Sequence, residues 1–447
     1  MKLAILEVPA LGTTGLQNAG LNDPECYVDS GRYRVDRRKF DIKAMQDDIT
    51  QIMKDDYDIF IVATAVPADW SVRLAVINFL ISGGEKVLGV PFLLTQSRHT
   101  QGYTTQKHNF QKLHSSRAAG YSVLALVVGS EAMVFEPAKR INGGIESIVV
   151  RTQLRKDLME TARLAVLDEM PKYRGALVRV DLWVDCETER VEFLDATYSL
   201  DLFSPISRTI DDKLVQSTVP GGHTALLDLM IAVMMTEDKA SGIQQKVIDS
   251  YATFQPQYDE SMTPTPYFRF MQKLTLDFDW TGTVLDLGCG TGVLGTLLHE
   301  KGAPFSIMGV DLSPEMTQSP AVLSYYVSPV TVGPLQTTIM KSIEFDHVAC
   351  FGALGYLPEP DFIAVLMRMF MVARKSITFD VGDFSDVSPD TDPDDALMLW
   401  NNHLKTWKNF RVPVGWRFAC NEYGLYFHDE QKGCKEVGYM VRLERAV

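Results

Sequence analysis

Thr283-Val-Leu-Asp-Leu-Gly-Cys-Gly-Thr-Gly292 is the stretch that decides the fold of the second half of the chain. Its apolar start is typical of a buried strand, three glycines follow at alternate positions, and Val293 to Lys301 has a helical pattern. A strand, a glycine turn and a helix together place backbone N–H groups against a ligand. Glycine is needed because a side chain would block that approach. The stretch therefore predicts a nucleotide site in an α/β fold.

Two aspartates end neighbouring predicted strands in this region. Asp286 ends the first strand, and Asp311 ends the next one, within Met308-Gly-Val-Asp-Leu-Ser313. A carboxylate at the second position can accept two hydrogen bonds from ribose hydroxyls. Asp286 can then face a cationic group, so the pair suits an adenosyl ligand that also carries a cation.

A second glycine pattern overlaps the first. Gly290-Thr-Gly-Val-Leu-Gly295 matches the GxGxxG fingerprint of dinucleotide sites, which by itself is a weak signal. That register would leave Asp286 in a buried strand without a partner, a costly place for an ionised carboxylate. We favour the cationic adenosyl ligand over a dinucleotide, and a structural loop without a nucleotide is the third interpretation.

The region from about Tyr258 to Val447 resembles the class I S-adenosylmethionine-dependent methyltransferases. The resemblance rests on DLGCGTG (286–292), GVDLS (309–313) and FDHVACFGALGYLPEP (345–360). It implies an enzyme with S-adenosyl-L-methionine as cofactor and a Rossmann-like sheet that an antiparallel hairpin completes. The cofactor contacts that it implies are Asp286, Gly288, Cys289, Gly290, Gly292, Asp311, Leu312, Cys350 and Phe351.

Within this resemblance, the glycines line the methionine part of the cofactor, Asp286 its ammonium side, Asp311 the ribose and Leu312 the adenine. The chain departs from the family at Thr331 to Gln336, where many members have an acid near the adenine amino group. Gln336 is the candidate substitute for that acid.

Few fixed catalytic residues are expected, because the cofactor supplies the methyl group and the protein orients and desolvates the reactants. Asp380 and Asp383 lie where relatives often contact the substrate, and Tyr258 resembles a residue that closes over the cofactor. His403 is the expected proton acceptor, since its ordinary pKa lies near working pH. We predict catalytic roles for His403, Asp380 and Tyr258, and a small-molecule substrate that is an amine or amino-acid-like.

The first half of the chain alternates apolar and helical patterns. Strands are expected within 2–10, 58–66 and 86–94, with helices around 41–54 and 70–82. From residue 121, strands with short turns predict an antiparallel sheet with a helix near 154–169. The polar stretch 236–242 is the candidate linker between domains 1–240 and 241–447.

Ala176 to Pro205, followed by Pro220-Gly-Gly, is similar to ATP-grasp ligases of the D-alanine–D-alanine ligase type, over about 230 residues in all. Asp181 stands at a magnesium-binding position of that family, but Asp195 and Thr197 replace its Glu and Asn. A segment with Lys107 in a helix runs directly into VLALVVGSE, without the subdomain that grips ATP. The resemblance implies a truncated ATP-grasp-like domain, without a metal or ligase activity, that packs as a scaffold or forms a homodimer.

Composition sets further limits. The 447 residues are 46% hydrophobic and 22% charged, as in folded globular proteins, and the net charge of −14 disfavours nucleic acid or an anionic membrane as partner. Six scattered cysteines give no zinc or disulfide pattern, and the N-terminus lacks a signal-peptide pattern. We expect a cytoplasmic protein that binds no membrane.

Three other functions stay open. The same cofactor could react at its aminocarboxypropyl carbon, which gives alkyl transfer or cyclisation. The chain could be an ATP-dependent ligase fused to a methyltransferase, or a binding protein without catalysis.

Overall fold

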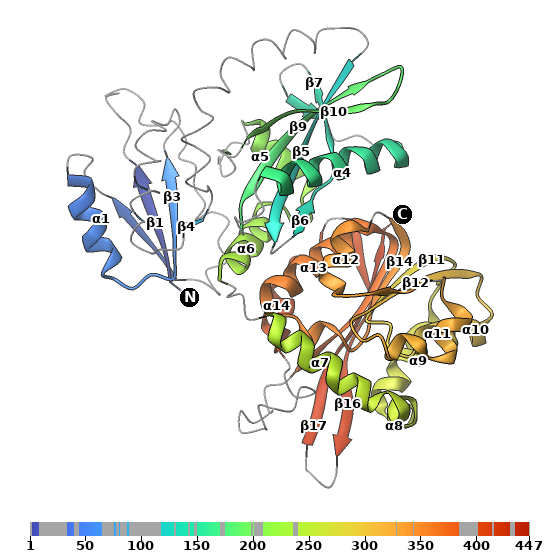
Figure 1. Cartoon of the computed structure of the whole chain (residues 1–447). Helices are drawn as coiled ribbons and strands as arrows, with labels where there is room; N and C mark the ends of the chain where they lie inside the picture. Colours follow the sequence, from blue (N-terminus) through green and yellow to red (C-terminus); the bar gives the residue numbers. More distant parts are fainter. Residues whose placement is uncertain are drawn as a thin grey trace. The chain divides into compact units, whose positions relative to one another are not determined.

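The computed structural model describes residues 2–8, 34–39, 44–64, 76, 80, 87–88, 118–128, 131–141, 144–146, 150–169, 175–197, 200, 209–235, 240–327, 329–342, 344–383, 401–413, 415–429 and 434–446. The chain forms two compact units, Met1–Met234 and Met235–Val447, and Figure 1 labels most of their helices and strands.

The N-terminal unit begins with a parallel sheet of strand order β2-β1-β3-β4. Its elements are β1 (Lys2–Val8), β2 (Arg34–Lys39), α1 (Met45–Met53), β3 (Ile59–Thr64) and β4 (Val87–Leu88). This arrangement confirms the three predicted strands and the first helix, whereas β2 was not predicted. Of the expected helix at 70–82, the structure describes Val76 and Leu80, which are both fully buried. Lys107 lies outside the described residues.

A second sheet of the N-terminal unit is antiparallel, with the order β10-β9-β5-β7-β8 and with β6 paired to β5. Its elements and the helices of this part are β5 (Ala118–Val128), β6 (Glu131–Val134), β7 (Ala138–Ile141), β8 (Gly144–Glu146), α4 (Thr152–Glu169), β9 (Leu177–Asp185), β10 (Val191–Thr197), α5 (Ile210–Thr218) and α6 (Gly222–Met235). The predicted antiparallel sheet and its helix are thus confirmed.

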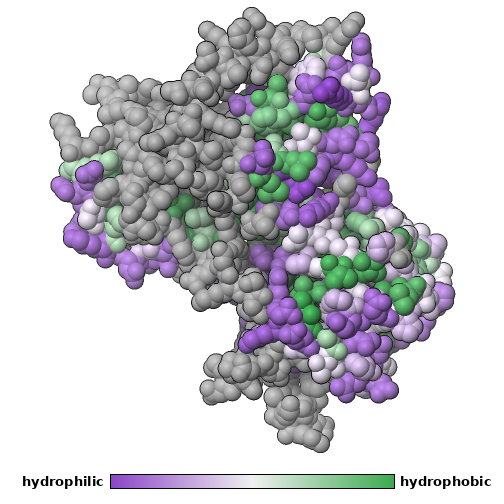
Figure 2. All heavy atoms as spheres, viewed as in Figure 1, coloured by the Kyte–Doolittle hydropathy of each residue, from purple (hydrophilic) through white to green (hydrophobic). Residues whose placement is uncertain are grey.

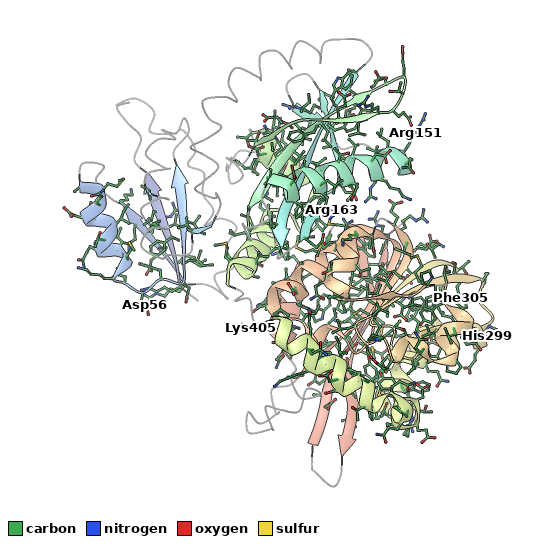
Figure 3. All side chains as sticks on the ribbon, in the orientation of Figure 1. Asp56, Arg151, Arg163, His299, Phe305 and Lys405 are labelled. Atoms are coloured by element: carbon green, nitrogen blue, oxygen red, sulfur yellow. The ribbon has the colours of Figure 1, made fainter. Side chains whose placement is uncertain are left out.

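Helix α4 covers one face of this antiparallel sheet. Its apolar side packs Leu158, Ala162 and Val166 against strand residues such as Val123 and Val178. Arg163, labelled in Figure 3, donates a hydrogen bond of 3.1 Å to Glu131 at the start of β6. Apolar burial and this ion pair therefore hold the helix to the sheet.

The C-terminal unit is built on a seven-stranded sheet of order β13-β12-β11-β14-β15-β17-β16. All neighbours pair in parallel except β17, which is antiparallel to both β15 and β16. The strands are β11 (Gly282–Leu287), β12 (Phe305–Asp311), β13 (Thr331–Val332), β14 (Phe345–Cys350), β15 (Ala373–Asp383), β16 (Trp416–Asp429) and β17 (Cys434–Arg445). The predicted Rossmann-like sheet with a final antiparallel hairpin is confirmed.

Helices precede this sheet and connect its strands. They are α7 (Ala240–Phe254), η3 (Gln255–Gln257), α8 (Tyr258–Met262), α9 (Pro266–Asp277), α10 (Val293–Lys301), η4 (Met316–Gln318), α11 (Pro320–Tyr325), α12 (Leu335–Lys341), η5 (Leu354–Tyr356), α13 (Glu359–Val372) and α14 (Leu404–Asn409). Helix α9 begins where the Thr265 side chain accepts a hydrogen bond from the Phe268 N–H and Pro266 fills the first turn. Of the expected linker at 236–242, residues 240–242 belong to α7, and the rest lie outside the described residues.

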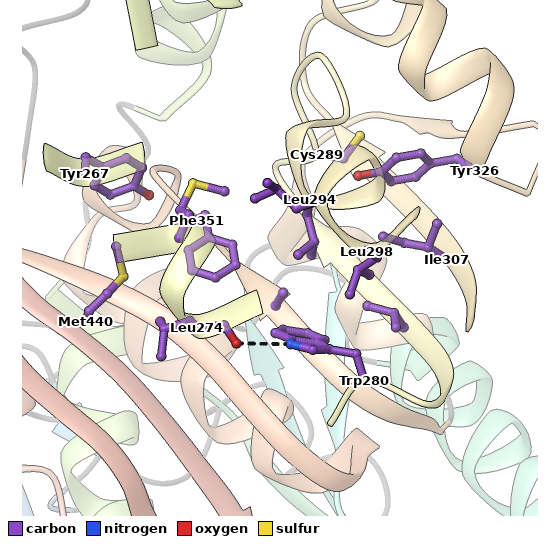
Figure 4. Close-up of a cluster of buried hydrophobic side chains, with 14 of the residues drawn as sticks. Tyr267, Leu274, Trp280, Cys289, Leu294, Leu298, Ile307, Tyr326, Phe351 and Met440 are labelled. Atoms are coloured by element: carbon purple, nitrogen blue, oxygen red, sulfur yellow. Dashed lines mark hydrogen bonds between the residues drawn. The ribbon is translucent and has the colours of Figure 1, made fainter. Parts of the chain in front are cut away.

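Trp280 anchors the core of the C-terminal unit. It is fully buried, and its indole N–H donates to the Leu274 carbonyl at 3.2 Å, as Figure 4 shows. The Arg442 guanidinium lies 4.7 Å from the centre of its ring. This cluster joins α9, the start of β11 and β17 beneath the glycine turn.

The visible face of the molecule mixes hydrophilic and hydrophobic side chains (Figure 2). No helix within the described ranges is long and apolar enough to cross a membrane.

Candidate functional site

The turn after β11 contains three glycines that cannot be replaced without strain. Gly288, Gly290 and Gly292 have φ of +76°, +52° and +86°, a region that side chains disfavour. A Cβ on Gly288 would lie 2.6 Å from the Cβ of Ala353. The N–H groups of Gly288 and Cys289 donate to the Val310 carbonyl at 2.7 and 3.0 Å, which fastens the turn to β12.

Asp311 links the end of β12 to this glycine turn. Its Oδ2 accepts from the Gly290 N–H at 2.7 Å, and its Oδ1 accepts from the Ser313 N–H at 2.8 Å. Burial raises the pKa of Asp311, whereas these N–H groups act in the opposite direction. Asp311 is therefore held in a fixed position at the carboxyl edge of the sheet.

A cavity of about 170 Å³ lies beyond the carboxyl ends of β11, β12 and β14. Its lining is mostly apolar and includes several of the expected cofactor contacts. These are Gly288, Gly290, Asp311, Leu312 and Phe351. Tyr258 and Gln336 also line the cavity. Gln336 directs its Nε2 toward Asp361 at 3.4 Å.

A smaller cavity of about 30 Å³ adjoins the same turn and is lined by Asp286, Cys289 and Tyr267, among others. Tyr258 lines both cavities. Asp286 is 3% exposed, and burial raises its pKa to about 7. Asp286 lines the smaller cavity and Asp311 the larger one, and Gly288 and Gly290 line both.

The helices before the sheet cover these cavities. The hydroxyls of Tyr251 on α7 and Tyr356 lie 3.0 Å apart, and the Thr291 hydroxyl donates to Asp259 on α8 at 2.6 Å. The sequence interpretation missed Tyr251 and Asp259. Aromatic residues repeating along the segment 251–258 were the available signal.

The structure places two predicted catalytic residues behind the lining of these two cavities. Asp380 accepts hydrogen bonds from the Tyr267 hydroxyl at 3.0 Å and from the Gly352 N–H at 2.6 Å. Burial raises the pKa of Asp380 to about 6. His403 stacks on Phe362 with ring centroids 4.1 Å apart. Both residues hold the segment after β14 in place.

His403 also has a backbone partner. Its Nε2 donates to the Leu357 carbonyl at 2.8 Å. Burial lowers the pKa of His403, so the ring stays neutral near pH 7.

Three other residues singled out from the sequence, Gly292, Cys350 and Asp383, line neither of these two cavities. Gly292 precedes α10 as its N-cap, and Cys350 is fully buried in β14. Asp383 accepts from the Tyr423 hydroxyl at 3.1 Å.

Asp181, the candidate magnesium position of the N-terminal unit, is surrounded by arginines. Its carboxylate lies 3.1 Å from Arg140 and 3.3 Å from Arg179 and accepts from the Ser122 hydroxyl at 2.6 Å. Arg179 also donates to Thr197 at 3.1 Å. Within the described part of the chain, no group of three His, Cys, Asp or Glu side chains could hold a metal.

A family model and two relatives similar to this chain are methyltransferases by name. Residues 284–376 match the family model described as a methyltransferase domain. YqeM of Bacillus subtilis (strain 168), whose name places it among the methyltransferases, is 29% identical over 167 residues, which cover 34% of this chain and 66% of that protein. Ubiquinone biosynthesis O-methyltransferase of Pseudomonas paraeruginosa is 36% identical over 83 residues, or 17% of this chain and 34% of that enzyme. The chain thus spans less than two thirds of either relative.

Two solved structures illustrate the distant likenesses. Magnesium protoporphyrin IX methyltransferase from Synechocystis PCC 6803 with bound S-adenosylhomocysteine is 15% identical with a TM-score of 0.32, covering 46% of this chain and all of that one. D-alanine–D-alanine ligase from Bacillus anthracis with ATP is 11% identical with a TM-score of 0.35, covering 53% of this chain and 97% of that one.

The family match coincides with the parallel part of the C-terminal sheet, from β11 to the start of β15. The C-terminal unit therefore contains a methyltransferase domain.

Proposed function

We propose that the chain is an S-adenosylmethionine-dependent methyltransferase that acts on a small molecule. The observation that carries the proposal is the cavity beside the glycine turn, where Asp311 is fixed by two backbone N–H groups and Gly288 and Gly290 line the space. The residues fit the cofactor, because a carboxylate and a glycine turn suit its ribose and its amino-acid part.

When bound, the cofactor supplies an electrophilic methyl group on its sulfonium. Asp311 would hold the ribose, Leu312 would pack on the adenine, and Asp286 would face the ammonium group. The apolar lining excludes water, which favours attack by a positioned substrate over hydrolysis. Transfer then depends mainly on orientation by these residues.

The proposal for the substrate is an amine or an amino-acid-like molecule. Asp380 supports it: the carboxylate is buried near the carboxyl end of β15, and the two hydrogen-bond donors that it has among the described residues, Tyr267 and Gly352, are neutral. A cationic substrate group would supply a counter-charge in that region.

The test of the proposed function uses S-adenosylmethionine with an isotopically labelled methyl group and a panel of amines, amino acids and neutral hydroxyl compounds. We expect label in an amine or amino-acid-like acceptor. Label in neutral acceptors alone would contradict the substrate class, and unlabelled acceptors throughout would count against methyl transfer.

Three substitutions test the catalytic assignments. Tyr258→Phe, Asp380→Asn and His403→Ala should each lower turnover and leave cofactor affinity within about threefold, the separation expected when binding and chemistry use different groups. Turnover is measured at saturating cofactor, and affinity by calorimetry. Tyr439→Phe is the control and should keep wild-type turnover, because that ring packs on Tyr423 and lines neither cavity. Wild-type turnover in all three variants would show that the substrate binds elsewhere.

We also propose that the N-terminal unit is an ATP-grasp-like scaffold without ligase activity. The guanidinium groups of Arg140 and Arg179 beside Asp181 support this proposal, because they occupy the surroundings in which a magnesium ion would need anionic ligands. Self-association through this unit belongs to the same proposal, and analytical ultracentrifugation of the full chain tests it.

The full chain should therefore show no magnesium-dependent thermal shift with ATP. A ligand that binds the folded state raises the melting temperature once its concentration exceeds Kd, so the assay is direct. S-adenosylhomocysteine is the positive control. A clear shift that requires both magnesium and ATP would overturn the scaffold proposal.

A further inference from the structure

Tyr326 is a buried side chain of the C-terminal unit that none of the roles above uses. It directly follows α11 and is 6% exposed. Its hydroxyl donates to Asp286 Oδ2 at 2.6 Å and accepts from the Gly295 N–H at 3.2 Å. One hydroxyl thus joins the end of β11 to the first turns of α10.

The ring of Tyr326 occupies space that three glycines leave. A Cβ on Gly309 would lie 2.8 Å from the ring, one on Gly292 would lie 3.2 Å from it, and one on Gly295 would collide with it. Gly295 stands inside α10, where glycine costs roughly 1 kcal/mol relative to alanine. The ring therefore has a fixed place between β12, the glycine turn and α10.

Asp286 has one oxygen free to meet a ligand. Its Oδ2 is bonded to Tyr326, whereas no described residue donates a hydrogen bond to Oδ1. The same carboxylate lines the small cavity beside the glycine turn. A donor that enters this cavity can complete the coordination of the carboxylate.

We propose that Tyr326 is a positioning residue for cofactor binding, whose hydroxyl fixes the Asp286 carboxylate so that Oδ1 receives the ammonium group of the cofactor. The proposal rests on the proposed function, because it assumes that this site binds S-adenosylmethionine and its product. Tyr326 acts through Asp286, and the ring of the tyrosine remains behind the glycines.

The charge of Asp286 gives the proposal a measurable signature. Burial raises the pKa of Asp286 to about 7, and the Tyr326 hydroxyl opposes that rise. An ionised carboxylate attracts an ammonium group, so affinity should increase as pH rises through this value and level off above it.

Other groups face Asp286 from the elements around it: Tyr326 after α11, Cys289 in the turn, Asp311 on β12, Cys350 on β14, and Tyr258 and Tyr267 on α8 and α9. Burial raises the pKa of each of these thiols and phenols, so they stay neutral from about pH 6 to 8. Asp311 can also titrate, as can Asp380 on β15, which accepts a hydrogen bond from Tyr267 and whose pKa burial raises to about 6.

Two ligands distinguish the effect of Asp286 on binding from the effect of Asp311. S-adenosylhomocysteine carries the ammonium group, whereas methylthioadenosine has the same ribose and a neutral sulfur without the amino-acid part. Calorimetry on the wild-type chain from about pH 6 to 8 should show affinity for S-adenosylhomocysteine rising with a midpoint near 7. Methylthioadenosine should show no such rise with that midpoint.

Tyr326→Phe removes the hydroxyl and keeps the ring. It should weaken the binding of S-adenosylhomocysteine about tenfold at pH 7, which is the scale of a lost hydrogen bond to a charged group. It should also move the pH midpoint of that binding upward, because the hydroxyl lowers the pKa of Asp286. Affinity for methylthioadenosine should stay within about twofold, because that ligand does not reach Asp286. Tyr325→Phe is the matched control, since that neighbouring ring stacks on His299.

Three results would overturn the inference. One is a wild-type profile that is the same for both ligands. Another is a Tyr326→Phe variant with unchanged affinity and midpoint, and a third is an equal loss for both ligands, which would mean that the hydroxyl supports the whole site. If the wild-type chain binds neither ligand, the proposed function itself is wrong, and the inference falls with it.

Discussion

Asp311→Ala is expected to weaken S-adenosylmethionine binding by a factor of about ten to more than a hundred. The substitution removes the carboxylate and with it the charge-assisted hydrogen bond to the ribose, which contributes about 1.5–3 kcal/mol to binding. The variant also loses the hydrogen bonds from the N–H groups of Gly290 and Ser313, so the glycine turn is less well ordered before binding.

Calorimetry on the folded variant measures this loss. Asp277→Ala removes an exposed carboxylate at the end of α9 and serves as the control, with affinity expected to match the wild type. An unchanged affinity in Asp311→Ala would remove Asp311 from the cofactor site.

Trp280→Ala should lower the free energy of unfolding of the C-terminal unit by about 3–5 kcal/mol, the range for deleting a large buried aromatic side chain. Trp280 is fully buried, bonded to the Leu274 carbonyl, and covered by Arg442. Its removal leaves a cavity beneath β11 and removes the ring on which the Arg442 cation lies.

Denaturant unfolding, followed through the transition that S-adenosylhomocysteine shifts, measures this change. Phe418→Ala is the control, because that side chain is 48% exposed and should cost far less. A loss below about 1 kcal/mol in Trp280→Ala would contradict the core described above.

The glycine turn and its two aspartates were predictable because each signal is local. The strand, the turn and the helix from Thr283 to Lys301 are consecutive in sequence, and the structure has β11 and α10 at those places. The final hairpin was expected from the resemblance to the methyltransferases, and the structure has β16 and β17 as its two strands.

Strand β2 escaped prediction because its sequence, RVDRRK, is charged at every position except Val35. It is the edge strand of the parallel sheet, and its side chains are partly or largely exposed. An edge strand of this kind lacks the apolar run that marks the buried strands β1 and β3, and charge on an edge protects it from pairing with other chains.

The side-chain partners in the site depend on contacts between residues that are far apart in sequence. Tyr267 and Asp380 are 113 residues apart, and His403 reaches the Leu357 carbonyl over 46 residues. The expectation that Asp286 would lack a partner if the turn bound a dinucleotide was wrong, because the Tyr326 hydroxyl donates a hydrogen bond to it within the protein. It also supplies a packing reason for Gly295, the last glycine of the GxGxxG match.

Methyl transfer is tested most directly by the identity of the cofactor product, measured by mass spectrometry after the full chain reacts with S-adenosylmethionine and acceptor candidates. We expect S-adenosylhomocysteine, formed in proportion to methylated acceptor and strongly reduced in Asp311→Ala. Methylthioadenosine as the product would contradict methyl transfer and would indicate reaction at the aminocarboxypropyl carbon instead.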